Sequence, residues 1–168
     1  SLLESFSKRR PVALVIPALH TELAGRALPR ILEQLALARY VKRVVISMNG
    51  MNAGQHRRAL RFFKARLDGV THTVLWNDGP RLGALHLEVD ALTGCSHTHG
   101  KGANVWMGIA HLLATGHRGI IACHDSDILN YERDMLWHLC LPVAHPEMGY
   151  VFAKSFYGRV RDRMYGRV

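Results

Sequence analysis

The chain has 168 residues, of which 48% are hydrophobic and 21% charged, and its formal net charge is +9. This length suits one domain with its own hydrophobic core and is short for two, and no apolar run approaches the roughly 18–20 residues of a membrane helix, so no membrane span is expected. The positive charge favours anionic partners, among them nucleotide sugars, phosphorylated small molecules and nucleic acid, and the absence of a signal-like apolar start makes a cytoplasmic protein the expectation.

Short apolar runs alternate with longer amphipathic segments. In chain order, the pattern predicts a strand at 12–16, a helix at 25–39, a strand at 41–47, a helix at 53–67, a strand at 71–75, a helix at 103–115 and a strand at 119–123. Residues 76–102 are less regular, a further helix begins near Tyr131, and residues 150–156 are strand-like. Near-continuous apolar strands that alternate with helices indicate an α/β fold whose parallel sheet is covered on both faces.

Helical spacing also predicts which side chains face the core. The inward positions are Leu28, Ile31, Leu32 and Leu35 in the first helix, Leu60, Phe63 and Leu67 in the second, and Val105, Ile109 and Leu112 in the third. Trp106 is also expected to pack in the core.

An acidic pair, Asp125 and Asp127 on either side of Ser126, follows the last predicted strand. Ligands of parallel sheets bind beyond the carboxyl ends of the strands, and two carboxylates there can converge on one divalent cation. Mg²⁺ and Mn²⁺ favour such oxygen ligands and share them with substrate phosphates. The alternative is that one of these carboxylates caps the helix that begins near Tyr131.

The second polar motif is Gly100-Lys101-Gly102, directly before a predicted helix. Glycines let a backbone approach a phosphate closely, and the first N–H groups of a helix favour an anion. Lys101 adds a positive charge at the same place. Taken alone, the motif is more typical of a flexible, solvated turn than of a phosphate site.

Four segments together resemble the retaining GT-A glycosyltransferases of the glucosyl-3-phosphoglycerate synthase type: 17–22, 100–106, 125–127 and 154–159. The resemblance runs from the first strand to the last residue. It implies a GT-A type, Rossmann-like nucleotide-binding sandwich with a mostly parallel sheet. It also implies that residues 1–168 form one nucleotide-sugar-binding domain, incomplete at its C-terminus and part of a longer catalytic domain.

The same resemblance implies a hexosyltransferase that uses Mg²⁺ or Mn²⁺ and forms a homodimer. Glucose would move from UDP-glucose to 3-phosphoglycerate or a similar small acid, with retained anomeric configuration. Mannosyl transfer from GDP-mannose to glycerate or phosphoglycerate stays open, because mannosylglycerate synthases share the Gly-Lys-Gly turn and an acidic pair. A non-catalytic nucleotide- or nucleic-acid-binding module is the other alternative, although the scattered basic residues argue against a nucleic-acid partner.

Matching motif to motif, the resemblance implies a role for each site residue. Asp127 and Lys101 would be catalytic, and Asp127 with Asp125 would bind the metal. The donor-binding residues would be Pro17, Ala18, Leu19, His20, Glu22, Ser47, Asn49, Lys101, Asp125 and Ser126, and the acceptor-binding residues would be Gly166, Arg167 and Val168.

Two departures from the family pattern leave the donor base open. His20-Thr21 stands where the family has an Asn-Glu pair, and Ser47-Met48-Asn49 replaces acidic residues after the second strand.

Overall fold

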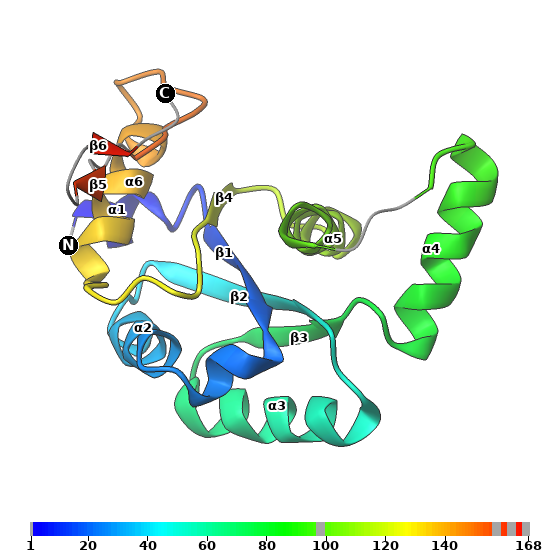
Figure 1. Cartoon of the computed structure of the whole chain (residues 1–168). Helices are drawn as coiled ribbons and strands as arrows, with labels where there is room; N and C mark the ends of the chain where they lie inside the picture. Colours follow the sequence, from blue (N-terminus) through cyan, green and yellow to red (C-terminus); the bar gives the residue numbers. More distant parts are fainter. Residues whose placement is uncertain (1, 97–99, 156–158, 161–163, 166–168) are drawn as a thin grey trace.

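The computed structural model describes residues 2–96, 100–155, 159–160 and 164–165 (Figure 1). In chain order the elements are α1 (Leu2–Phe6), β1 (Val12–Leu19), the 3-10 helix η1 (His20–Ala24), α2 (Ala27–Ala36), β2 (Val41–Asn49), α3 (Ala53–Arg66), β3 (His72–Trp76), α4 (Pro80–Thr93), α5 (Lys101–Ala114), β4 (Ile120–Cys123), α6 (Arg133–Ala144), β5 (Arg159–Val160) and β6 (Met164–Tyr165). No helix in this described part of the chain combines the length and apolar character that a membrane crossing requires.

The predicted parallel sheet is confirmed. Its four strands lie in the order β3-β2-β1-β4, and every neighbouring pair is parallel. β1 pairs with β2 along its whole length, from Val12 to Leu19, but it pairs with β4 only from Val12 to Val15. The carboxyl end of β1 therefore extends beyond its β4 neighbour, which matters for the site described below.

Helices cover the sheet on both faces (Figure 1): α2 and α3 lie on one face and α5 on the other. The larger core lies under α2 and α3 and contains the predicted residues Leu28, Ile31, Leu32, Leu35, Phe63 and Leu67. The smaller core is formed by Ala13, Val15, Val45 and Leu75 of the strands with Leu112 of α5. Removing these apolar surfaces from water is the main stabilising contribution to the fold.

α5 packs on the sheet through a face rotated from the predicted one. Its buried residues are Asn104, Met107, Gly108 and Leu112, whereas Val105 and Ile109 are only half-buried. A methyl group at Gly108 would lie 2.5 Å from Cγ1 of Val15, so the helix approaches β1 as closely as a glycine permits. Trp106, expected in the core, is 54% exposed, because the rotation carries it to the outer side.

Three further expectations were wrong. Leu60 is 43% exposed, since α3 packs through Ala59 and Phe63 instead. Residues 150–155 form no strand. The irregular stretch after β3 contains a 14-residue helix, α4, which stands away from the sheet (Figure 1).

Candidate active site

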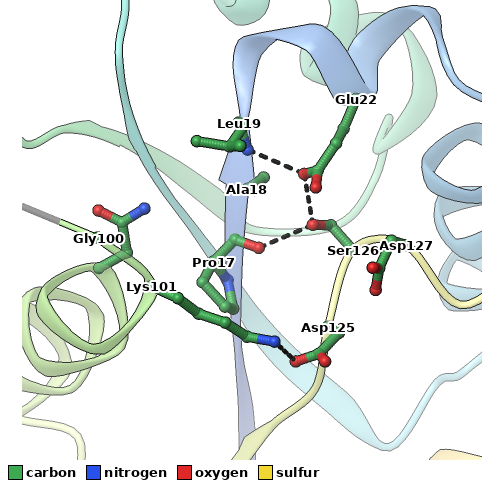
Figure 2. Close-up of a pocket in the computed structure, with 10 residues that line it drawn as sticks. Pro17, Ala18, Leu19, Glu22, Gly100, Lys101, Asp125, Ser126 and Asp127 are labelled. Atoms are coloured by element: carbon green, nitrogen blue, oxygen red, sulfur yellow. Dashed lines mark hydrogen bonds and ion pairs between the residues drawn. The ribbon is translucent and has the colours of Figure 1, made fainter.

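A cavity of about 270 Å³ opens at the carboxyl ends of β1 and β4 (Figure 2). Its walls are residues 17–19 at the end of β1, Glu22 of η1, residues 125–127 after β4, and Gly100, Lys101 and Asn104 at the start of α5. The acidic motif and the Gly-Lys turn, far apart in sequence, therefore face each other across one opening, as the sheet topology predicts.

Main-chain chemistry keeps the strands apart at this opening. The carbonyl oxygen of Val15 accepts the N–H of His124 at 3.4 Å, so alternate residues of β1 turn their backbone toward β4. Pro17 is the next residue in that set and has no N–H to donate. Its carbonyl oxygen lies 2.8 Å from Oγ of Ser126 in place of a backbone partner. The ladder stops there, and the chain after β4 diverges.

Side chains join the segment after β1 to the segment after β4. Oε2 of Glu22 accepts the backbone N–H of Leu19 at 2.8 Å, and it lies 2.5 Å from the hydroxyl oxygen of Ser126 (Figure 2). The hydroxyl carries one hydrogen and has two acceptors, Glu22 and Pro17, within reach. Ser126 is 3% exposed. Glu22 and Ser126 thus hold the mouth of the cavity in a defined shape.

The charged groups of the cavity are arranged asymmetrically. Nζ of Lys101 lies 2.5 Å from Oδ1 of Asp125, and the two side chains are 60% and 33% exposed. The Asp127 carboxylate is exposed, and no described side chain or backbone group bonds to it. Neither carboxylate caps α6, whose N-cap residue is Glu132. The capping alternative is therefore not supported.

The start of α5 forms the opposite wall. Gly100 has φ of +140°, a conformation that favours glycine, and it lines the cavity directly before the first residue of the helix. The 14-residue helix presents its first N–H groups at this end, and Lys101 adds its ammonium group. Backbone donors, helix dipole and charge together suit a phosphate or diphosphate.

A buried amide network supports this wall. Nδ2 of Asn77 donates to Oγ of Ser47 at 2.9 Å and to Oδ1 of Asn104 at 2.7 Å, and Nδ2 of Asn104 donates to Oδ1 of Asn49 at 3.2 Å. Asn77 and Asn104 were missed by the sequence reasoning. The signal for Asn104 was its spacing of four and eight residues from Gly108 and Leu112, which are buried on the same helix face.

Some predicted residues lie beside the cavity instead of lining it. Ser47 is fully buried and bonds to Asn77. Asn49 is half-buried and reaches a lining residue, Asn104. His20 is half-buried in η1, and its Nε2 has no partner among the described residues. The predicted acceptor-binding residues Gly166, Arg167 and Val168 lie outside the described residues.

Burial tunes two groups next to the acidic pair. Burial lowers the pKa of His124, whose Nδ1 lies 2.9 Å from the backbone oxygen of Asp125, so the ring is neutral at pH 7. Burial, and secondarily the Asp125 charge, raises the pKa of the Cys123 thiol. Neither group therefore brings a charge to the cavity at neutral pH.

The donor set fits a hard divalent cation shared with a ligand. Asp125 and Asp127 offer carboxylate oxygens, which Mg²⁺ and Mn²⁺ prefer. Within the described residues, no group of three or more His, Cys, Asp or Glu side chains is placed to hold a metal ion. A cation here would complete its shell with water and ligand phosphates, which is the usual arrangement for Mg²⁺.

Comparison with known proteins confirms the resemblance predicted from the motifs. No protein-family profile matches the chain. It is 36% identical, over 99% of its length, to the glucosyl-3-phosphoglycerate synthase of Persephonella marina, and 32% identical, also over 99%, to that of Methanococcoides burtonii. In both cases it covers 41% of the relative, so the chain spans about two fifths of the length of the curated relatives that it matches.

Solved structures share the fold. The glucosyl-3-phosphoglycerate synthase of Mycobacterium tuberculosis in complex with Mn²⁺, UDP and phosphoglyceric acid gives a TM-score of 0.54 at 23% identity, over 86% of this chain and 43% of that one. The same enzyme with Mg²⁺ and UDP gives 0.55 at 22% identity, over 87% and 43%. The predicted GT-A type α/β fold is thus confirmed.

Proposed function

We propose that this chain carries the donor-binding half of a glucosyl-3-phosphoglycerate synthase, an enzyme that moves glucose from UDP-glucose to 3-phosphoglycerate. The main support is the convergence of Lys101, Asp125 and Asp127 on one cavity at the carboxyl ends of the strands. Likeness to two curated synthases along 99% of the chain supports the same activity.

In this proposal the diphosphate of the donor lies between the two walls. The first N–H groups of α5 and the Lys101 ammonium bind its oxygens, and Asp127, with Asp125, holds Mg²⁺ or Mn²⁺ against it. When bound, the cation supplies neutralisation of the negative charge on the departing diphosphate. The cavity of about 270 Å³ is small beside the pockets of about 300–1,000 Å³ that usually enclose a ligand.

Lys101 has a second task in this scheme. In the ligand-free structure its ammonium group is paired with Asp125. If Asp125 shared a cation, its carboxylate would attract the Lys101 ammonium group less strongly, and Lys101 would bind the diphosphate oxygens instead. There it stabilises the leaving group as the bond to the sugar breaks, in the way of a preorganised electrostatic donor.

The carboxylates lining the cavity do not favour a covalent glycosyl-enzyme. Glu22 is bonded to the backbone of Leu19 and to Ser126, and Asp125 is paired with Lys101. The third carboxylate, Asp127, is assigned to the cation in this proposal. We therefore propose a front-face displacement with retained configuration. The acceptor hydroxyl oxygen bonds to the anomeric carbon, the carbon–oxygen bond to the diphosphate breaks, and the hydroxyl proton passes to the leaving diphosphate.

The proposal is tested by titrating the full chain with UDP-glucose in the presence of Mn²⁺, using calorimetry. Asp127→Asn keeps the size of the side chain but weakens a metal ligand, so metal-dependent affinity should fall at least about tenfold. Asp68→Asn, an exposed position after α3, makes the same charge change elsewhere and should leave affinity unchanged. Equal binding by the wild type with and without Mn²⁺ would contradict the proposal.

Two further arms decide between sugars and acceptors. GDP-mannose replaces UDP-glucose in the same titration, and glycerate replaces 3-phosphoglycerate in a transfer assay whose product anomer is read by proton NMR. Preferred binding of GDP-mannose would favour mannosyl transfer instead. The cytoplasmic location, the homodimer, and acceptor binding by Gly166, Arg167 and Val168 stay predictions from the sequence.

A further inference from the structure

The main chain that carries the acidic pair is held at three points as it leaves β4. The N–H of His124 donates to the carbonyl oxygen of Val15 at 3.4 Å. The hydroxyl oxygen of Ser126 lies 2.8 Å from the carbonyl oxygen of Pro17. Between these two contacts, the carbonyl oxygen of Asp125 lies 2.9 Å from Nδ1 of the His124 ring. This third contact fixes the plane of the peptide that links Asp125 to Ser126.

The His124 ring makes that contact through Nδ1. A carbonyl oxygen can only accept, so in the neutral ring Nδ1 carries the hydrogen and Nε2 carries a lone pair. Nε2 is buried and has no partner among the described residues. An unpaired buried acceptor costs stability, and an apolar side chain of similar size would avoid that cost. What the ring adds over such a side chain is the hydrogen bond from Nδ1.

The far end of the loop after β4 supports the His124 ring. The ring packs against buried Tyr131, with 4.8 Å between the ring centroids and 48° between the ring planes. The carbonyl oxygen of Tyr131 accepts Nε of Arg30 at 3.0 Å, which joins this end of the loop to α2. Residues 124 and 131 therefore close the loop at its base, and both acidic residues lie between them. A loop ordered in this way loses less conformational entropy when a ligand binds.

We propose that His124 is a positioning residue for the cation: its Nδ1–H bond to the carbonyl oxygen of Asp125 sets the direction in which Asp125 and Asp127 project toward the metal. The inference rests on the proposed function and deepens it, by adding a residue outside the metal's own ligands. Without this bond the peptide after Asp125 can rotate, and the rotation turns one carboxylate relative to the other. Hydrogen bonds that orient metal ligands contribute about 10–100-fold to metal affinity, and one bond to a backbone oxygen should lie near the lower value.

The test compares two variants of the same shape. His124→Asn and His124→Leu both branch at Cγ and both lose the ring, but only asparagine can place an N–H donor where Nδ1 lies. Calorimetry on the full chain measures the affinity for UDP with Mn²⁺ and with EDTA in its place, and the ratio of these affinities is the metal gain. The gain of His124→Leu should be roughly tenfold lower than that of His124→Asn. In EDTA both variants should bind UDP equally, because the start of α5 and Lys101 are unaltered.

His117→Leu is the matched control. Nε2 of His117 lies 3.1 Å from the backbone oxygen of Ile120, so it makes the same kind of contact at the opposite end of β4. The substitution should lower the melting temperature and leave the metal gain at the wild-type value. A metal gain lost in this variant as well would show that any weakening around β4 has the effect, and it would overturn the role of His124.

The melting temperature separates a structural role from a positioning role. A merely structural His124 would give two variants of lower melting temperature and equal metal gain, which would overturn the proposal. If His124→Leu does not fold, His124→Gln replaces it, because its amide reaches the position of Nε2 instead of Nδ1. Its metal gain should again be roughly tenfold below that of His124→Asn, and equal gains would overturn the proposal. A wild type without any metal gain contradicts the proposed function itself, whereas equal gains in variants of a metal-dependent wild type contradict this inference alone.

Discussion

The contact between Ser126 and Glu22 offers the sharpest stability test of the site. Ser126→Ala removes the hydroxyl that lies 2.5 Å from Oε2 of Glu22 and 2.8 Å from the oxygen of Pro17. A hydrogen bond to a charged acceptor contributes about 1.5–3 kcal/mol. Because Glu22 is only half-buried and water can replace part of the lost bond, we expect a loss of about 1.5–2 kcal/mol in the free energy of unfolding.

Urea unfolding followed by circular dichroism measures this loss, and the melting temperature should fall by roughly 3–8 °C, at about 2–4 °C for each kcal/mol. Ser5→Ala, at an exposed position of α1, is the control and should change stability by less than about 0.5 kcal/mol. In a double-mutant cycle, Ser126→Ala should cost much less when Glu22 is already replaced by Ala. Equal costs in both backgrounds would refute the claim that these side chains hold the loops together.

Two other predictions concern packing and titration. Gly108→Ala should destabilise the fold by about 1–3 kcal/mol in urea unfolding, because the new methyl group would lie 2.5 Å from the stiff Val15 side chain. Gly102→Ala on the same helix is the control: its methyl group would meet no atom within 4 Å, so this variant should be neutral or stabilising. Equal effects of the two variants would contradict the close approach of α5 to β1. Burial raises the pKa of Cys140 to about 12, so its thiol stays protonated in the folded chain above the value of 9.0 at which it ionises when unfolded, and stability should fall as the pH rises above 9. Cys140→Ala should reduce that slope in unfolding experiments between pH 8 and 10, and an unchanged slope would show that another group is responsible.

The sheet was predictable because short apolar runs alternate with longer amphipathic segments, which is the pattern of a parallel sheet covered by helices. Helix α4 was missed for the opposite reason. Its Leu85 and Leu92 follow helical spacing, but Leu87 lies on the opposite side and all three are exposed, so the apolar residues mark no side that packs in the core. The buried face of α5 was misplaced because it includes a polar residue, Asn104, which a hydrophobic pattern assigns to the surface.

The acidic pair and Lys101 could be placed at one opening from the sequence, since the carboxyl ends of parallel strands share an edge. The pairing of Lys101 with Asp125, and the freedom of Asp127 from any bond to the described groups, could not be predicted. Both depend on the exact distance between α5 and the loop after β4. α5 approaches the sheet closely where Gly108 meets Val15, and no local sequence motif encodes such packing.

Pro17 affects whether the cavity is open, and it does so separately from the side chains that decide which ligand binds there. The β1–β4 ladder does not continue at Pro17, which has no N–H to donate, so a main-chain feature as well as the side chains opens the cavity at this place. Cavity side chains other than Glu22 and Ser126, which join the two loops, can then be exchanged to suit another ligand while the opening persists. A residue with a backbone N–H at position 17, by contrast, would let the pairing of β1 with β4 continue, which would narrow the space for every ligand.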